Sequence, residues 1–274
     1  MTFDSFSSAW SVMIWATFAL AIVMGAVVNK TNFCTMGAVS DWVNMGDKGR
    51  LRAWFFAIAV ALLGVTALEY LGVLNADLAF PPYRGGTLVW AENILGGFLF
   101  GIGMTYGSGC GNKTLIRVGA GNIKSIMVFL LIAVIAYYMT NPLPGSDQTL
   151  MSVLFLDWIR PLAITLEGGS QDLGTLLAGS ENAADARLWI GIVLGVLVLA
   201  FVFKSADFRS SLDNILGGLV VGLVVVAAWF VTADIKLGYE SDFDGEVKVS
   251  MREYLDPTTS QWDMSEAVRA DWTT

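Results

Sequence analysis

The chain has 274 residues, of which 55% are hydrophobic and 15% are charged, and its mean hydropathy is +0.62. This composition excludes an ordinary soluble domain and is typical of a polytopic membrane protein. Most of the net charge of −8 comes from residues 234–274, which hold ten acidic and four basic side chains, so nothing indicates nucleic-acid binding.

Four stretches without charged side chains are long enough to cross a hydrocarbon core about 30 Å thick: residues 5–29, 93–112, 125–146 and 214–233. The first is too long for a signal peptide and lacks a basic leader, so we expect a retained span. Residues 32–46 include Asp41 and are too short and polar to cross. We expect them to form a re-entrant or broken helix, followed by an apolar helix over about 53–74.

Loops and spans alternate through the rest of the chain. We expect a loop over 75–90, which contains Pro81-Pro82, and a helix that opens at Glu92 and runs to a glycine-rich break. The remaining expected parts are a span over 125–140, a loop over 141–187 with an interfacial piece at 150–166, and spans over 188–203 and 214–232. The predicted fold is therefore all-α: a polytopic helical membrane protein with short re-entrant or broken helices that meet near the bilayer midplane.

Basic residues predict the orientation in the bilayer. An external N-terminus places nine of the sixteen Lys and Arg residues on the cytoplasmic side, whereas the external loop 141–187 holds six acidic and two basic residues. The positive-inside rule favours this arrangement. We therefore expect a multi-pass membrane protein whose N-terminus is external.

An internal repeat bears on the domain organisation. The sequence Asn-Ile-Leu-Gly-Gly occurs at 93–97 and again at 214–218, and each copy has a further glycine four residues on. Small residues at this spacing are also common wherever membrane helices pack, so the match has a structural alternative. If the repeat is real, residues 1–233 form a transport domain that ends at the start of a second repeat. Residues 234–274 are then a polar, external tail or inter-repeat loop, and the sequence is expected to be truncated or a shortened member of its group.

The chemistry open to the chain is narrow. The sequence has no histidine, which excludes histidine-ligated metals and Ser-His or Cys-His catalysis within it. Its two cysteines, Cys34 and Cys110, are too far apart in sequence to form a zinc knuckle or a disulfide framework. We therefore expect no enzyme active site, no cofactor and no metal.

The two cysteines lie in unusual settings for small buried hydrophobes, which is what free cysteines often are. Gly103–Leu115 interrupts an apolar helix with four glycines, and Asn32–Ala38 is its counterpart. Irregular backbone at membrane depth is tolerated where it lines a cavity or binds a ligand. The candidate substrate-path residues are Cys34, Thr35, Ser108, Gly109, Cys110, Gly111, Asn112, Lys113 and Thr114.

Broken helices direct their positive N-terminal ends at anions, and hydroxyl and amide groups add neutral donors. A protonated thiol can donate weakly to a soft anion that contains sulfur, so the pattern favours such a ligand. Lys113 either attracts the anion or extends to the cytoplasmic interface with Arg117. Asp41 either faces the same cavity as a gate or proton relay, or makes a polar contact at a helix end.

The sequence resembles the YeeE/YedE family of bacterial sulfur-transport membrane proteins, which includes thiosulfate uptake proteins. The resemblance covers roughly residues 10–232. It rests on NFCTMGAVSD at 32–41, GDKGRLR at 46–52, GGFLFGIGM at 96–104, GSGCGNKTLIR at 107–117 and GNIKS at 121–125. It implies that cysteine thiols, here Cys34 and Cys110, pass thiosulfate toward the cytoplasm by transient S–H···S contacts. Full-length relatives have a second half with further cysteines, which this sequence does not supply.

Two other functions stay open at this stage. The chain could be a membrane sulfur acceptor that hands persulfide sulfur from Cys110 to a cytoplasmic carrier or sulfurtransferase. It could also be a non-transporting membrane subunit, related to selenium handling, whose cysteines are packing residues. The expected partners are a small sulfur-containing anion and the lipid bilayer.

Overall fold

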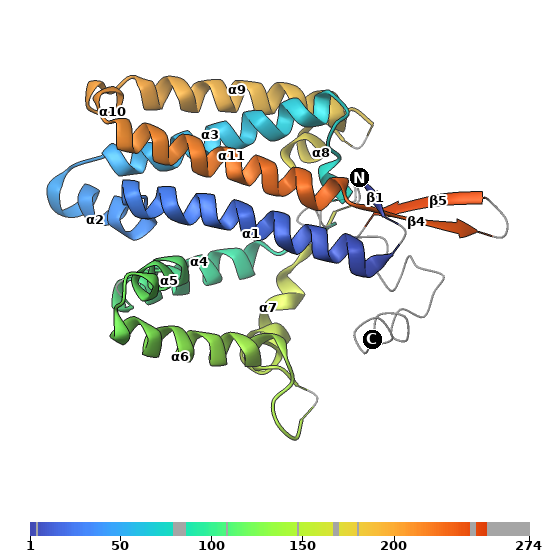
Figure 1. Cartoon of the computed structure of the whole chain (residues 1–274), viewed down its shortest axis with the longest axis horizontal. Coiled ribbons are helices and arrows are strands. Elements are labelled where there is room, and N and C mark those ends of the chain that lie inside the picture. Colours follow the sequence, from blue (N-terminus) through green and yellow to red (C-terminus); the bar gives the residue numbers. More distant parts are fainter. Residues whose placement is uncertain are drawn as a thin grey trace. The chain divides into compact units, whose positions relative to one another are not determined.

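The computed structural model of the protein, drawn in Figure 1, describes residues 1–3, 5–78, 86–107, 109–146, 148–166, 170–179, 181–241 and 245–250. Its chain forms two compact units. The first comprises residues 1–33, 52–85 and 172–274, and the second comprises residues 34–51 and 86–171. Helices dominate both units, which confirms the predicted helical membrane fold.

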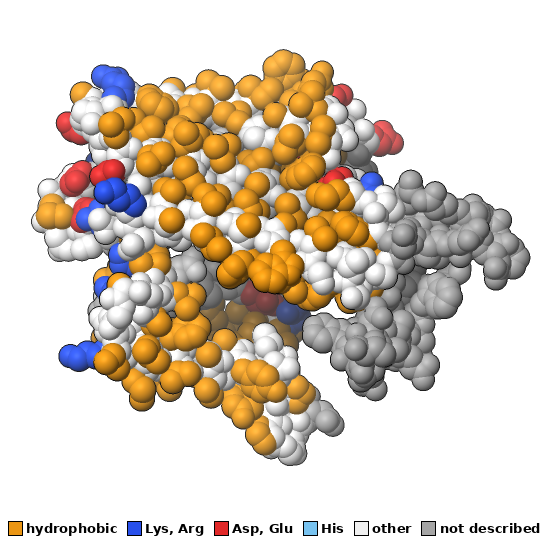
Figure 2. Space-filling view, viewed as in Figure 1, with side chains coloured by type: hydrophobic (Ala, Val, Ile, Leu, Met, Phe, Trp, Pro, Cys, Tyr) orange, Lys and Arg blue, Asp and Glu red, His pale blue; other side chains and the backbone are white. Residues whose placement is uncertain are grey.

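Five stretches of the described residues are long and apolar enough to cross a membrane: Phe6–Met45, Gly49–Tyr70, Ile123–Thr140, Ala183–Phe203 and Leu212–Asp234. Hydrophobic side chains cover much of the visible surface of these helices in Figure 2. Such a surface is stable against hydrocarbon and not against water. The protein is therefore a multi-pass membrane protein.

Long helices form the core of the first unit: α1 (Phe6–Thr31), α3 (Gly49–Tyr70), α9 (Ala183–Phe203) and α11 (Leu212–Asp234). Three short helices accompany them: η1 (Ala76–Leu78), α8 (Leu173–Ala178) and α10 (Ala206–Ser210). Glycines let the long helices approach closely. Gly195 of α9 faces Leu63 of α3, and Gly218 of α11 faces Phe56 of α3.

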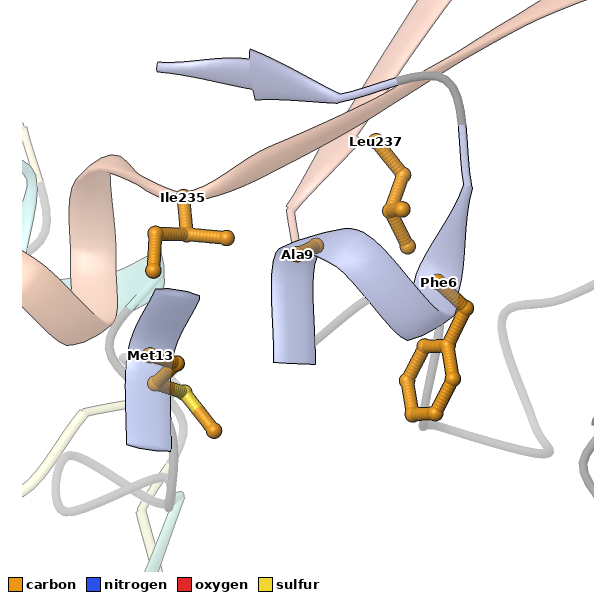
Figure 3. Close-up of a cluster of buried hydrophobic side chains, with 5 residues drawn as sticks. All are labelled: Phe6, Ala9, Met13, Ile235 and Leu237. Atoms are coloured by element: carbon orange, nitrogen blue, oxygen red, sulfur yellow. The ribbon is translucent and has the colours of Figure 1, made fainter. Parts of the chain in front are cut away.

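A small sheet lies at one end of the first unit. Strand β4 (Lys236–Ser241) pairs in parallel with β1 (Thr2–Phe3) and antiparallel with β5 (Gly245–Ser250). Beneath it the ends of α1 and β4 share a buried apolar cluster, which Figure 3 shows: Phe6, Ala9, Met13, Ile235 and Leu237. The sequence predicted a polar tail or loop from residue 234 onward, and the strands β4 and β5 were not predicted.

The second unit holds the shorter helices: α2 (Thr35–Met45), α4 (Trp90–Tyr106), α5 (Gly111–Gly119) and α6 (Ile123–Thr140). A short helical segment follows, made of η2 (Ser152–Leu156), α7 (Asp157–Ile159) and η3 (Arg160–Leu162). It is tied to the start of α4, because Arg160 Nε lies 2.9 Å from Glu92 Oε1 and Trp90 Nε1 donates to the Leu162 carbonyl at 2.8 Å. Strands β2 (Thr87–Leu88) and β3 (Ile164–Thr165) pair antiparallel beside this junction.

Two helices begin four or more residues earlier than the sequence predicted. Helix α3 begins at Gly49 rather than near residue 53, because the Asp47 carboxylate accepts the Gly49 N–H at 2.8 Å. Helix α9 begins at Ala183 rather than 188, because the charge of Arg187 is paired: its Nη2 lies 2.7 Å from Asp172 Oδ2. The predicted turn at Pro81-Pro82 lies outside the described residues.

The two copies of the glycine repeat differ in their surroundings. In α11 a Cβ added at Gly222 would lie 2.8 Å from the Ala57 carbonyl oxygen and 2.7 Å from Val60 Cβ of α3. In α4 a Cβ added at the equivalent Gly101 would meet no described atom within 4 Å. In the second copy, glycine therefore serves close packing against α3, and the repeat itself stays a prediction.

We expect Gly222→Ala and Gly101→Ala to have opposite effects on stability. The first forces α11 away from the α3 backbone and should cost about 1–3 kcal/mol, as overpacking does. The second adds a better helix former in open space and should leave the melting temperature unchanged or higher. Thermal unfolding in detergent measures both, and equal shifts in the two variants would contradict the packing described for α11.

Candidate functional site

Cys34 is the residue immediately before helix α2. Helix α1 ends at Thr31, and its C-cap residue Asn32 has a left-handed backbone (φ 52°). The chain turns there and continues into Cys34, which has extended geometry (φ −155°, ψ 129°). The Cys34 Sγ atom accepts the Gly37 N–H at 3.4 Å, and the Cys34 carbonyl accepts the Ala38 N–H at 2.9 Å. The thiol therefore serves as the N-cap of α2, a position usually held by Ser, Thr, Asp or Asn.

Cys110 occupies the same place at helix α5. Helix α4 ends at Tyr106, and Gly109 returns its N–H to the Met104 carbonyl at 2.9 Å with φ 150°, a conformation that favours glycine. Cys110 is extended (φ −78°, ψ 173°) and is the N-cap residue of α5, but its side chain makes no capping hydrogen bond. Its sulfur therefore does not cap α5 as the Cys34 sulfur caps α2.

The neighbours of Cys110 are packed in different ways. Thr114 is 3% exposed, and its Oγ1 donates to the Cys110 carbonyl at 3.2 Å. The aliphatic stem of Lys113 lies against Gly109, where a Cβ would meet its Cβ and Cγ at 3.0 Å. Gly111 and Asn112 form the first turn of α5, so their backbone N–H groups point toward its N-terminal end.

Both cysteines therefore stand at the positive end of a short helix that follows a break in the chain. Each helix presents free N–H groups in its first turn, which together with the macrodipole form a setting that favours negative charge. The predicted broken-helix geometry is present at both positions. Among the described residues, no hydrogen bond or ion pair joins the Cys34 segment to the Cys110 segment.

The two remaining predicted path residues are Thr35 and Ser108. Thr35 is the first residue of α2 and is half-buried. Ser108 lies outside the described residues. Within the part of the chain that the structure describes, no cluster of three or more Cys, Asp or Glu side chains is placed to hold a metal ion.

Asp41 is buried, and its Oδ2 lies 2.7 Å from the Arg50 Nε. Of the two alternatives for Asp41, the structure shows the polar contact at a helix end. The pairing of Arg50 with Asp41 was not predicted, because Arg50 entered the predictions only through the positive-inside rule and the GDKGRLR motif at 46–52. A single acid within an apolar stretch, followed shortly by an arginine, is the signal that could have indicated the pair.

Comparison with known proteins identifies the family. The model of the sulphur transport family matches residues 30–267, which include both cysteine segments. The chain belongs to the sulphur transport family. This membership confirms the resemblance that the motifs around Cys34 and Cys110 indicated.

Two curated relatives in this family bear the name thiosulfate transporter TsuA. The chain is 30% identical to the Escherichia coli K12 protein over 139 residues, which cover 50% of the chain and 38% of that protein. It is 26% identical to the Spirochaeta thermophila protein over 234 residues, which cover 75% of the chain and 68% of that protein. The chain thus spans less than half of one relative and about two thirds of the other. No solved structure matches the chain significantly.

Proposed function

We propose that this protein carries thiosulfate, or a closely related soft sulfur-containing anion, across the bacterial inner membrane into the cytoplasm. The observation that carries the proposal is the placement of both cysteines at the N-caps of α2 and α5. Free N–H groups at a helix start attract the anion. The names of the two relatives support thiosulfate as the substrate.

In this mechanism the thiols discriminate between anions of similar charge. Thiosulfate carries a terminal sulfur that is large and polarisable, and a thiol S–H can donate to it weakly. Sulfate offers only hard oxygens, which prefer stronger donors than a thiol. Sulfate also loses more hydration energy than thiosulfate on entering an apolar site. A path lined by thiols and helix starts therefore favours thiosulfate over sulfate, performs no chemistry on it and needs no enzyme active site, cofactor or metal.

The charge distribution supports the proposed orientation of the chain in the membrane. The basic side chains Lys48 and Arg52 lie just before and within the first turn of α3, and Lys113 and Arg117 lie in α5. The proposed orientation puts these residues on the cytoplasmic side and the N-terminus on the periplasmic side. An anion that leaves the cysteines would then meet positive charge at the cytoplasmic exit, where a sulfur carrier or sulfurtransferase would accept it.

The absence of a capping hydrogen bond at the Cys110 thiol favours one alternative, a sulfur acceptor. In that reaction a Cys110 thiolate attacks the outer sulfur of thiosulfate and forms a new S–S bond. The original S–S bond breaks with its electron pair, and sulfite leaves. The positive end of α5 would stabilise the negative charge of the attacking thiolate.

Thiosulfate labelled at one sulfur at a time separates these functions. The assay measures uptake by cells that lack other thiosulfate transport and express the protein. Transport predicts that outer-sulfur and inner-sulfur labels enter at equal rates and that neither becomes covalently bound to the protein. Outer label bound to Cys110, with inner label left outside as sulfite, would replace transport with the acceptor function. Entry of neither label would favour a non-transporting subunit.

A further inference from the structure

The guanidinium group of Arg50 lies against the first turn of α2, beside Cys34. A Cβ added at Gly37 would collide with Arg50 Nη1, and the same Cβ would lie 3.4 Å from Cys34 Cβ. Both side chains therefore flank one point on the Gly37 backbone. The Gly37 N–H is also the group that the Cys34 sulfur accepts. Arg50 is thus the charged side chain placed next to the Cys34 cap.

The ion pair with Asp41 fixes the orientation of the Arg50 guanidinium group. Asp41 lies four residues after Gly37, which is about one helical turn further from Cys34. Its buried carboxylate, 8% exposed, holds the Nε of Arg50 at 2.7 Å. The guanidinium is planar and rigid, so fixing Nε toward Asp41 also fixes the Nη1 edge near Gly37. The Asp41 carboxylate therefore lies on the side of the guanidinium away from Cys34, and the Nη1 edge lies toward Cys34.

The Arg50 side chain is 37% exposed. It is therefore neither sealed inside the protein nor free to move through solvent. A charge held at a partly covered site acts over a short range with less screening than a surface charge. The most direct recipient of its field is the region in front of the Cys34 thiol, where the α2 N–H groups also point.

We propose that Arg50 is the residue that sets charge selectivity at Cys34, with Asp41 as its anchor and Gly37 as the gap that admits its guanidinium. This assignment rests on the proposed function, because it makes Cys34 a position for an anion. A protonated thiol and a helix start alone supply partial charges, and the pair of Arg50 with Asp41 adds a stronger dipole whose positive end is the guanidinium. Arg50 is a positioning residue, because it would act on the anion through its field while the Cys34 thiol makes the contact.

The test measures the electrostatic field at Cys34 and needs no transport. In a Cys110→Ser background, Cys34 is the only cysteine of the chain. Two methanethiosulfonate reagents of similar size, one anionic and one cationic, are reacted with the protein in detergent, and the ratio of their rates is recorded. We expect Arg50→Gln to lower the anionic-to-cationic ratio by about fivefold or more, as the loss of a nearby fixed charge should.

Lys48→Gln is the matched control. Lys48 lies between α2 and α3, and its Nζ is 5.7 Å from the centre of the Trp42 ring. Its replacement by glutamine changes the net charge by the same amount as Arg50→Gln does. We expect less than a twofold change in the ratio for this variant. Equal effects of Arg50→Gln and Lys48→Gln would show a general charge effect and overturn the proposal.

Gly37→Ala tests the position of the Arg50 guanidinium group at constant net charge. The new methyl group displaces the end of the flexible Arg50 side chain but keeps the Gly37 N–H and the net charge. The ratio should fall as it does in Arg50→Gln, whereas an unchanged ratio would overturn the role of the gap. If the field behaves as expected but thiosulfate uptake is absent, the proposed function fails and the assignment of Arg50 to Cys34 stands.

Discussion

Replacing Cys110 with alanine is expected to lower thiosulfate uptake by about 10- to 100-fold. This range corresponds to the loss of one donor to a charged ligand, about 1.5–3 kcal/mol. Alanine removes the sulfur without altering the extended backbone of this N-cap, whose side chain makes no capping bond in the structure. The measurement is the initial rate of labelled thiosulfate entry, normalised to the amount of protein in the membrane.

Cys110→Ser and Cys34→Ala serve as comparisons for this variant. Serine keeps a donor but replaces the soft sulfur with a hard oxygen, so its uptake should fall between those of the parent and the alanine variant. Cys34→Ala also removes the acceptor of the Gly37 N–H and should lower the melting temperature slightly as well as the uptake. Parent-level uptake in both alanine variants would remove the cysteines from the substrate path.

Gly109→Ala is expected to lower uptake by about tenfold or more while every candidate donor remains in the sequence. Gly109 has φ 150°, which costs a residue with a Cβ roughly 1–3 kcal/mol. Its new Cβ would also lie 3.0 Å from Cβ and Cγ of Lys113. The chain can relieve both problems only by moving the turn that places Cys110 at the start of α5.

Gly111→Ala is the matched control on the other side of the same cysteine. Gly111 is the first residue of α5, and a Cβ there would meet no described atom within 4 Å. Alanine favours the helix at this position, so uptake should stay within about twofold of the parent. A similar loss in both variants would mean that any bulk beside Cys110 blocks the path, and the backbone conformation of Gly109 would not be the cause.

Much of this fold follows from patterns that the sequence displays directly. Charge-free stretches of about 20 residues predict spans, and α1, α6 and α11 lie where those stretches lie. The glycines around Cys110 predict an interruption, and the structure has one between α4 and α5. These signals work because each depends on the local chain alone.

The remaining features depend on partners that are distant in sequence or on the shape of side chains. The early start of α9 depends on the ion pair between Arg187 and Asp172, and no pattern within α9 indicates Asp172 as the partner. The pair between Asp41 and Arg50 joins two helices across a turn. The strand β5 had a weak local signal, since Val247 and Val249 alternate with charged or polar residues. The acidic composition of that region led to its interpretation as a tail or loop.

The capping role of the Cys34 sulfur was also beyond sequence reasoning. Cysteine is an uncommon N-cap, so its presence before α2 does not by itself mark a helix start. The structure shows that Cys34 and Cys110 hold equivalent backbone positions, although only one of them uses its sulfur for capping. The two sites therefore differ in how freely the thiol can turn toward a ligand.

Protection of the two thiols by substrate tests the central claim most directly. In the membrane-embedded protein, the alkylation rates of Cys34 and Cys110 are measured separately by mass spectrometry, with increasing thiosulfate or with sulfate at equal ionic strength. The account predicts that thiosulfate slows alkylation of both cysteines with one saturation curve, and that sulfate leaves both rates unchanged. Equal protection by the two anions, or protection of neither cysteine by thiosulfate, would contradict a path built from cysteine thiols.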